Sequence, residues 1–201
     1  MATRRGTLRQ TWTALRALVV FTIVLGIGYP LVVLGIGQFA FPNQANGSLL
    51  TVDGRVVGSS LIGQSFTDAD GNALPEWFQS RPSAAGTGYD GRASSGSNYG
   101  PENPDLIAAI EARRAAIADL DGVDPASIPA DALTASASGL DPDISPEYAY
   151  LQVARVATAR GLSEAEVRAL VDAHVEGRTL GYLGEPTVNV LELNVALAQL
   201  G

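Results

Sequence analysis

The 201-residue chain contains no cysteine and no lysine, and it has a single histidine, His174. Without cysteine it has no disulfide, no thiolate ligand for a metal and no cysteine nucleophile. Without lysine it has no Ser–Lys dyad and forms no Schiff base. One histidine excludes a multi-histidine zinc site, and no GxSxG motif supplies the serine of a Ser-His-Asp triad. His174 lies in the last turn of an expected helix, where it is most simply a favourable charge.

Acidic residues are also absent from the first 52 positions, where Arg4, Arg5, Arg9 and Arg16 are the charged residues. The remainder holds 9 arginines and 21 acidic residues, a net charge of −12. Such a charge disfavours nucleic acid and attracts cations, although solubility is the plainer explanation. A chain rich in Ala, Gly and Arg but without Lys is typical of a bacterium with a GC-rich genome.

A long uncharged segment follows the arginines. Residues 17–40 carry no charge, and a helix of that length spans about 36 Å, enough for a hydrocarbon core of about 30 Å. We therefore predict a cytoplasmic basic tail (1–16), a transmembrane helix (17–41) and an extracytoplasmic domain (43–201), because arginines flank only one end. A cleaved signal peptide is the alternative, but its apolar region would be shorter.

The expected transmembrane helix contains residues that favour packing against another helix. Pro30 removes a backbone donor and predicts a local kink. Gly28 and Gly35 are seven residues apart, and Gly26 and Gly37 are eleven apart. Each spacing places a pair on one helix face, where a partner helix can approach closely. Glycine is common in membrane helices in any case.

The remaining chain predicts one compact α+β domain. Asp53-Gly54 between apolar runs predicts a β-hairpin, and residues 76–79 suggest a strand or a segment packed by its aromatics. Residues 82–103 predict a long loop. Predicted helices start at Asn103, Ser145, Ser163 and Asn189 and end near Leu120, Gly161, Gly177 and the C-terminus, and residues 130–137 form a short link.

Several polar groups are candidate contacts, each with a plainer alternative. Residues 68–72 resemble half of a calcium loop without its distal glutamate, and a simple turn is favoured. Arg81 and Ser83 adjoin a Gly/Ser loop and suggest an anion nest. Asp141 and Asp143 suggest a loop that contacts an ion or a partner, or ordinary turn chemistry.

One basic helix position is a further candidate. Arg155, beside Gln152 in the helix expected after Ser145, suggests a contact to an acidic partner, while a solvated charged face is the default.

Five segments carry a resemblance to a known family. They are RPSAA (81–85), SSGSN (94–98), SASGLDPDISPE (136–147), QVARVATARG (152–161) and GEPTVNVLELN (184–194). Together and in this order they resemble the C subunit of the Kdp potassium-transporting ATPase, over essentially the whole chain.

The resemblance implies an accessory subunit of a bacterial plasma-membrane complex. Its partners would be a channel-like potassium subunit, a P-type ATPase subunit and a very small single-span subunit. It also implies a catalytic chaperone that raises the ATP affinity of the ATPase subunit. Family proposals for nucleotide contacts fall on Ser95, Gly96, Ser97 and Asn98, where Ser95 replaces the usual glycine, and on a glutamine, either Gln152 or Gln64.

The charge asymmetry places the domain outside the cell, whereas ATP is cytoplasmic. We therefore expect the domain to cap the outer entrance of the potassium subunit and any effect on ATP to be long-range. Two other classes remain open: a tethered extracytoplasmic hydrolase that uses Ser and Asp of the 82–103 and 136–143 loops, and a free-standing membrane-anchored binding or adhesion module.

Overall fold

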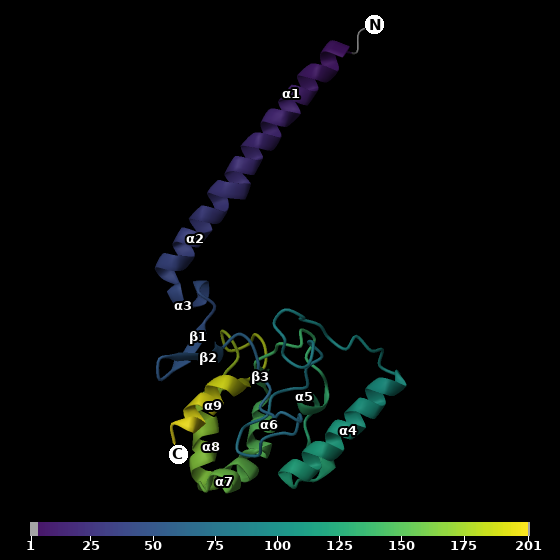
Figure 1. Cartoon of the computed structure of the whole chain (residues 1–201), viewed down its shortest axis with the longest axis vertical. Coiled ribbons are helices and arrows are strands. Elements are labelled where there is room, and N and C mark those ends of the chain that lie inside the picture. The colour runs from purple at the N-terminus through teal and green to yellow at the C-terminus, as the bar shows by residue number, and fades with distance from the viewer. Residues whose placement is uncertain (1–3, 201) are drawn as a thin grey trace. The chain divides into compact units, whose positions relative to one another are not determined.

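The computed structural model describes residues 4–200 of the chain. It divides into two compact units, residues 1–48 and 49–201, and each is described by itself (Figure 1). The first unit is helical and the second mixes helices with strands, which confirms the α+β prediction.

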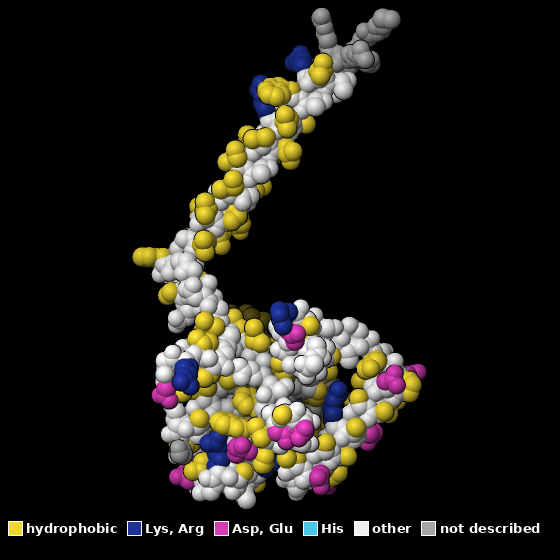
Figure 2. Space-filling model, viewed as in Figure 1, with side chains coloured by type: hydrophobic (Ala, Val, Ile, Leu, Met, Phe, Trp, Pro, Cys, Tyr) yellow, Lys and Arg dark blue, Asp and Glu magenta, His cyan; other side chains and the backbone are white. Residues whose placement is uncertain are grey.

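The first unit is a long helix in three parts: α1 (Arg4–Phe21), a π-helical stretch η1 (Thr22–Gly28) and α2 (Tyr29–Ala40). A short turn of helix, α3 (Pro42–Ala45), follows. Within Thr7–Ala40 an 18-residue window has a mean hydropathy of 2.5, and this is the one helix in the described chain long and apolar enough to cross a membrane. Hydrophobic side chains lie all along this helix in Figure 2, and basic ones only near its beginning. Helix therefore starts well before the predicted span and ends one residue before its predicted end.

The disturbance expected at Pro30 takes the form of the π-helical stretch. Pro30 lacks an amide proton, and the preceding Tyr29 N–H donates to the Val24 carbonyl, five residues back. A π-helical turn shifts the α-helical period. Gly28 and Gly35 both lie at or beyond its end, so their shared face persists. Gly26 lies within the π-helical stretch and Gly37 lies beyond it. The α-helical period that would place these two glycines on one face therefore does not apply to them.

The second unit begins with the predicted hairpin. Strands β1 (Leu49–Val52) and β2 (Arg55–Ser59) pair antiparallel with a bulge between Leu50 and Thr51. Asp53 and Gly54 both have positive φ, 49° and 76°, which is the geometry that such a turn requires. The chain then runs without regular helix or strand to Asn103, as expected for the loop 82–103. Residues 76–79 form no strand: Phe78 is completely buried, so this segment is held by side-chain packing.

The helices of this unit are α4 (Pro104–Asp121), the 3₁₀ turn η2 (Pro125–Ser127), α5 (Ala130–Leu133), α6 (Pro146–Leu151), α7 (Val153–Arg160), α8 (Glu164–His174) and α9 (Val190–Ala198). Four of them begin where the capping residues predict. The helix expected from Ser145 to Gly161 is instead divided at Gln152 into α6 and α7, and the expected link 130–137 begins with α5. Side chains of Asn103, Ser145, Ser163 and Asn189 each accept from a backbone N–H of the following turn, and Ser163 with Glu166 forms a complete capping box. The prediction for the end of α8 is wrong, because the helix stops at His174 and residues 175–176 are extended.

A small antiparallel sheet was missed by the sequence analysis. Strands β3 (Asp143–Ile144), β5 (Thr187–Asn189) and β4 (Val175–Glu176) pair in that order. Strands of two or three residues are too short to show alternation. The sheet joins the start of α6, the end of α8 and the start of α9.

The core lies between this sheet, the segment around Phe78 and helices α6 to α9. Its members include Phe78, Ile144, Tyr148, Val156, Val167, Val171, Val188, Leu193 and Leu197, each at most 3% exposed. Helix α4 has no fully buried residue and covers the core with Ile110 and Ile117.

Candidate functional site

The two Gly/Ser-rich loops named by the family resemblance lie against each other. The Ser95 N–H donates to the Ser138 carbonyl oxygen at 3.0 Å. A Cβ on Gly96 would lie 2.8 Å from the Ala137 carbonyl oxygen, and one on Gly139 would lie 2.6 Å from the Ser95 carbonyl oxygen. Gly139 also has a positive φ of 69°. This contact therefore requires glycine at both positions.

The tip of the SSGSN loop is held by local contacts. Asn98 has a positive φ of 53° and its Nδ2 donates to the Gly96 carbonyl oxygen at 3.1 Å. Asn98 is exposed and Ser97 is half-buried. The loop follows no strand and opens no helix, so it lacks the setting of a phosphate-binding loop.

Arg81, Ser83 and Asp141 are brought together beside these loops. Arg81 Nη1 lies 2.7 Å from Asp141 Oδ2. Ser83 Oγ donates to the Gly139 carbonyl oxygen at 2.6 Å and accepts the Tyr89 N–H at 2.9 Å. These bonds fasten one Gly/Ser loop to the other. The predicted anion nest is thus partly occupied by groups of the chain itself.

Tyr89 closes this cluster. Its hydroxyl donates to the Arg81 carbonyl oxygen at 2.7 Å, and burial raises its pKa to about 12. A Cβ on Gly63 would lie 2.4 Å from the Tyr89 ring, so the ring rests on that glycine. Arg81 Nε is buried and has no hydrogen-bond partner among the described residues.

Gln152 and Arg155 lie in a separate, buried polar network at the joint between α6 and α7. Gln152 is completely buried. Its Oε1 accepts the Gln79 N–H at 2.7 Å and Arg155 Nη2 at 2.7 Å, and its Nε2 donates to the Gln79 carbonyl oxygen at 3.2 Å. The amide therefore pairs with the backbone of residue 79 much as a neighbouring strand would. Among residues 4–200, the hydrogen bonds of Gln152 and Arg155 reach Gln79, Pro75, Trp77 and Asp121 rather than residues 95–98.

Arg155 completes that network. Its Nε lies 2.6 Å from Asp121 Oδ1, with side chains only 5% and 1% exposed. Its Nη1 donates to the carbonyl oxygens of Pro75 at 2.6 Å and Trp77 at 2.9 Å. Burial raises the pKa of Asp121, and the neighbouring Arg155 opposes that rise. The side chain that suggested a contact to an acidic partner is thus engaged within the domain.

The other candidate glutamine supports the hairpin. Gln64 Nε2 donates to the Val57 carbonyl oxygen at 2.8 Å, and a Cβ on Gly58 would lie 2.2 Å from that same nitrogen. Gln64 is half-buried. It thus satisfies a carbonyl on the outer side of strand β2.

Asp143, on strand β3, lies among other acidic groups. Burial first, and then the charges of Asp141, Glu176 and Glu192, raise its pKa to about 6, while a hydrogen bond from Asn189 opposes the rise. Asp141 is neutralised by Arg81, whereas no ion pair of the described chain includes Asp143. Asp143 therefore holds its proton to a higher pH than an ordinary aspartate and ionises around pH 6.

Three residues of the buried network were missed by the sequence analysis. Asn194 exchanges two hydrogen bonds with the backbone of Phe78, at 3.0 and 2.9 Å. It lies on the apolar stripe of α9, and a polar residue on such a stripe was a signal. Asp121 is the last residue of α4, where the helix dipole disfavours a carboxylate. Its position in the sequence was therefore a signal that it pairs with a cation. The pairing of Gln79 with Gln152 had no signal in the sequence.

Shallow hollows mark the surface of both units. One of about 300 Å³ is lined by polar groups including Ser65, Thr67, Ser80, Arg81 and Thr87. A second, of about 590 Å³, lies on the hairpin and shares Ser65, Gly88 and Tyr89 with the first.

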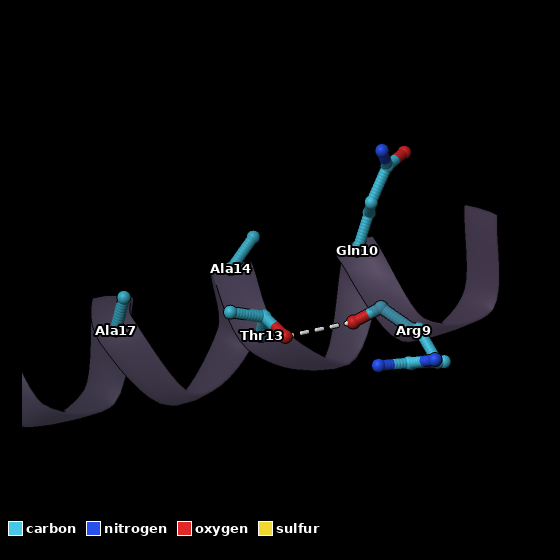
Figure 3. Close-up of a pocket in the computed structure, with 5 residues that line it drawn as sticks. All are labelled: Arg9, Gln10, Thr13, Ala14 and Ala17. Carbon is cyan, nitrogen blue, oxygen red and sulfur yellow. Dashed lines mark hydrogen bonds between the residues drawn. The ribbon is translucent and has the colours of Figure 1, made fainter. Parts of the chain in front are cut away.

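A third hollow lies along α1 and is lined by Arg9, Gln10, Thr13, Ala14 and Ala17. Figure 3 shows Gln10, Ala14 and Ala17 on one side of the helix, Arg9 on another, and the Thr13 hydroxyl bonded to the Arg9 carbonyl oxygen at 2.9 Å. The small side chains of Ala14 and Ala17 therefore leave room for the hollow on this side of α1.

The described residues do not assemble a recognisable catalytic centre. No group of three or more His, Asp or Glu is placed to hold a metal ion among them. The loop 68–72 is a turn in which Asp68 accepts from the amides of Asp70 and Asn72. His174 Nδ1 lies 2.8 Å from the Leu170 carbonyl oxygen, within its own helix. Fold and site together define an α+β domain that follows one helix long and apolar enough to cross a membrane, and most of whose candidate polar groups bond to one another or to the backbone.

The particular family follows from comparison with known proteins. A family model described as "K+-transporting ATPase, c chain" matches residues 11–199. Among its relatives, the potassium-transporting ATPase KdpC subunits of Kineococcus radiotolerans and Caulobacter vibrioides are 58% and 57% identical, and each alignment covers at least 90% of both chains. That of Streptomyces avermitilis is 48% identical over 97% of this chain and 96% of its own. The chain belongs to the KdpC family, as the five segments predicted, and is a subunit of a potassium-transporting ATPase.

Proposed function

We propose that this chain is a non-catalytic subunit that braces a potassium-importing ATPase from outside the cytoplasmic membrane and favours the ATP-binding state of a separate catalytic subunit. Its family carries the proposal, because each of the three relatives named above is described as a subunit of a potassium-transporting ATPase. The proposed partners are a channel-like potassium subunit, a P-type ATPase subunit and a very small single-span subunit.

The proposed orientation puts the N-terminus in the cytoplasm and the α+β domain outside. Four arginines precede the apolar helix and no acidic residue opposes them before Asp53, so the positive-inside rule favours a cytoplasmic N-terminus. The acidic domain would then stand at the outer entrance of the potassium subunit and concentrate cations there.

The proposed effect on ATP is indirect. ATP would lie across the membrane from this domain. In addition, the amide of Gln152 already pairs with Gln79 and Arg155, and the Ser95 N–H is bonded to Ser138. We therefore assign the influence on nucleotide to contacts made through the glycine-bearing helix, with Gly28 and Gly35 as its packing face.

Orientation is tested by labelling single cysteines, since the chain has none of its own. Glu164→Cys lies on an exposed position of α8 and Gln10→Cys on α1. A membrane-impermeant maleimide added to spheroplasts should label the first and not the second until the membrane is opened. The reverse pattern would show that the domain is cytoplasmic and would end the capping proposal.

Membership of the complex is tested by mild-detergent purification of the tagged chain. A P-type ATPase and a channel-like protein should be recovered with it, and the Gly28→Leu/Gly35→Leu variant should recover less. Val33→Leu, at an exposed apolar position on the opposite face of the same helix, is the matched control. Recovery of the chain alone would favour the free-standing binding module. A hydrolase assay of the purified chain tests the remaining alternative.

A further inference from the structure

The hairpin that opens the globular unit exposes apolar side chains where polar ones are expected. In a two-stranded hairpin with one buried face, the outward positions are normally polar. Here Leu49 and Val56 are 57% and 60% exposed, and Leu61 in the following turn is 61% exposed. Leu50 and Val52, on the alternate positions of β1, are half-buried instead. The outward apolar side chains are therefore additional to those that hold the hairpin.

The same region differs in charge from the rest of the domain. Residues 49–64 contain one acidic and one basic residue, Asp53 and Arg55, both at the turn. Residues 65–201 contain 20 acidic residues and 8 arginines, a net charge of −12. A bilayer with anionic lipids repels the acidic surface. The hairpin is consequently a part of the domain that a lipid surface tolerates.

Two of these apolar side chains, Leu49 and Val56, also border a hollow. It has a volume of about 590 Å³ and is lined by Leu49, Val56 and Ile62 together with small or uncharged residues, and no charged residue lines it. A groove of this kind accepts apolar groups without burying an unpaired charge.

Chain length keeps the hairpin close to the membrane. Leu49 lies nine residues after Ala40, the last residue of the apolar helix. Nine residues extend at most about 30 Å, and α3 shortens that reach. Because the headgroup region adds several ångströms to each side of the hydrocarbon core, roughly 5–8 Å, the reach includes the whole interface.

We propose that the outward face of the β1–β2 hairpin and its following turn, carried by Leu49, Val56 and Leu61, rests in the headgroup region of the bilayer. The apolar face thereby continues the lipid contact of the span, and Arg55 at the turn lies among headgroup phosphates. This inference rests on the membrane anchoring described above but not on the identity of any partner subunit. It gives the domain a second attachment, which limits its rotation about the end of the helix.

The test uses the full chain in vesicles of phosphatidylethanolamine and phosphatidylglycerol. Single cysteines at Val56 and Leu61 carry a fluorophore, and quenching by a nitroxide on the lipid is compared with quenching by aqueous iodide. Glu164→Cys on α8 is the matched exposed control, and Leu25→Cys reports insertion of the span. The labels at 56 and 61 should be quenched at least twofold more by lipid nitroxide than the label at 164, and less by iodide.

Each other outcome overturns the proposal in a distinguishable way. If the label at 25 is in lipid while those at 56 and 61 behave like the label at 164, the anchor holds but the hairpin is not on the bilayer. If the labels become protected only when the purified ATPase subunits are added, the face belongs to a partner protein. If the label at 25 is itself not in lipid, the span fails and this inference fails with it. Leu61→Asp, at a position that is 61% exposed, should reduce lipid quenching at 56; an unchanged value also counts against the proposal.

Discussion

Replacing Gln152 by leucine tests whether this residue is structural or contacts nucleotide. In the folded domain its amide receives the Gln79 N–H and an Arg155 N–H and returns a bond to the Gln79 carbonyl oxygen. Leucine has a similar volume but removes all three bonds. Gln152 is fully buried, so the groups left behind are poorly reached by water.

The expected loss follows from these partners. An unsatisfied buried donor costs about 1–3 kcal/mol. The Gln79 N–H loses its partner outright, while Arg155 keeps Asp121 and two carbonyl oxygens. We therefore expect a loss of about 3–4 kcal/mol, a large share of the 5–15 kcal/mol typical of a domain. For a domain of this size that corresponds to a fall in Tm of roughly 6–15 °C.

Thermal unfolding is followed by the fluorescence of Trp77, whose carbonyl oxygen accepts a bond from Arg155. A Trp12→Phe background leaves Trp77 as the sole tryptophan. Gln152→Glu retains the acceptor for the Gln79 and Arg155 N–H groups, so its free energy of unfolding should fall by less than that of Gln152→Leu. Gln199→Leu changes an exposed position, and its free energy of unfolding should stay within about 0.5 kcal/mol of the parent's. If Gln152→Leu melts with the parent while the complex loses ATP affinity, the structural argument is refuted and direct contact is favoured.

Two further substitutions act at the loops and the small sheet. Gly139→Ala places a methyl group 2.6 Å from the Ser95 carbonyl oxygen, at a residue with positive φ, and should lower Tm by several degrees. A methyl group at Gly177 meets no atom within 4 Å, so the control Gly177→Ala should lower Tm by less than 2 °C or not at all. The pKa of Asp143 is raised to about 6 from 3.8, so the folded state holds the proton more tightly and stability falls as pH rises from about 4 to 6. Asp143→Asn removes that slope. Above pH 6 its free energy of unfolding should exceed that of the parent by on the order of 1 kcal/mol, a figure reduced for the solvent screening of the half-exposed carboxyl. Equal urea midpoints at pH 4 and pH 8 in the parent would contradict this.

Local signals predicted most of the helical structure. Asn103, Ser145 and Ser163 start helices as capping chemistry requires, and Gly161 ends α7 with a positive φ of 68°. The positions at which these helices begin and end depend on neighbours within a few residues, so they can be predicted from the local sequence. The hairpin turn at Asp53-Gly54 was predictable for the same reason.

The small sheet and the buried network were not predictable because they join distant residues. Strand β5 pairs with strands that precede it by about 12 and 45 residues along the chain, and each strand is too short to show a period. Gln152 meets Gln79 across 73 residues and Arg155 meets Trp77 across 78. As a result, Gln152, a candidate nucleotide contact, and Arg155, a candidate partner contact, both support the segment 75–79 from within the domain.

The internal use of these groups constrains how such a subunit can influence ATP. A tenfold change in ATP affinity requires about 1.4 kcal/mol of coupling between the two subunits. That energy must come from contacts that are stronger in one state of the ATPase subunit than in another. The Gln152 network is already satisfied, and the SSGSN loop is held against residues 137–139. The exposed apolar surface of the membrane helix is available for such contacts, and partial burial of two of its side chains supplies energy of that size. Coupling should therefore persist when Ser97 or Asn98 is replaced by alanine, and should fall when Gly28 and Gly35 are replaced by leucine.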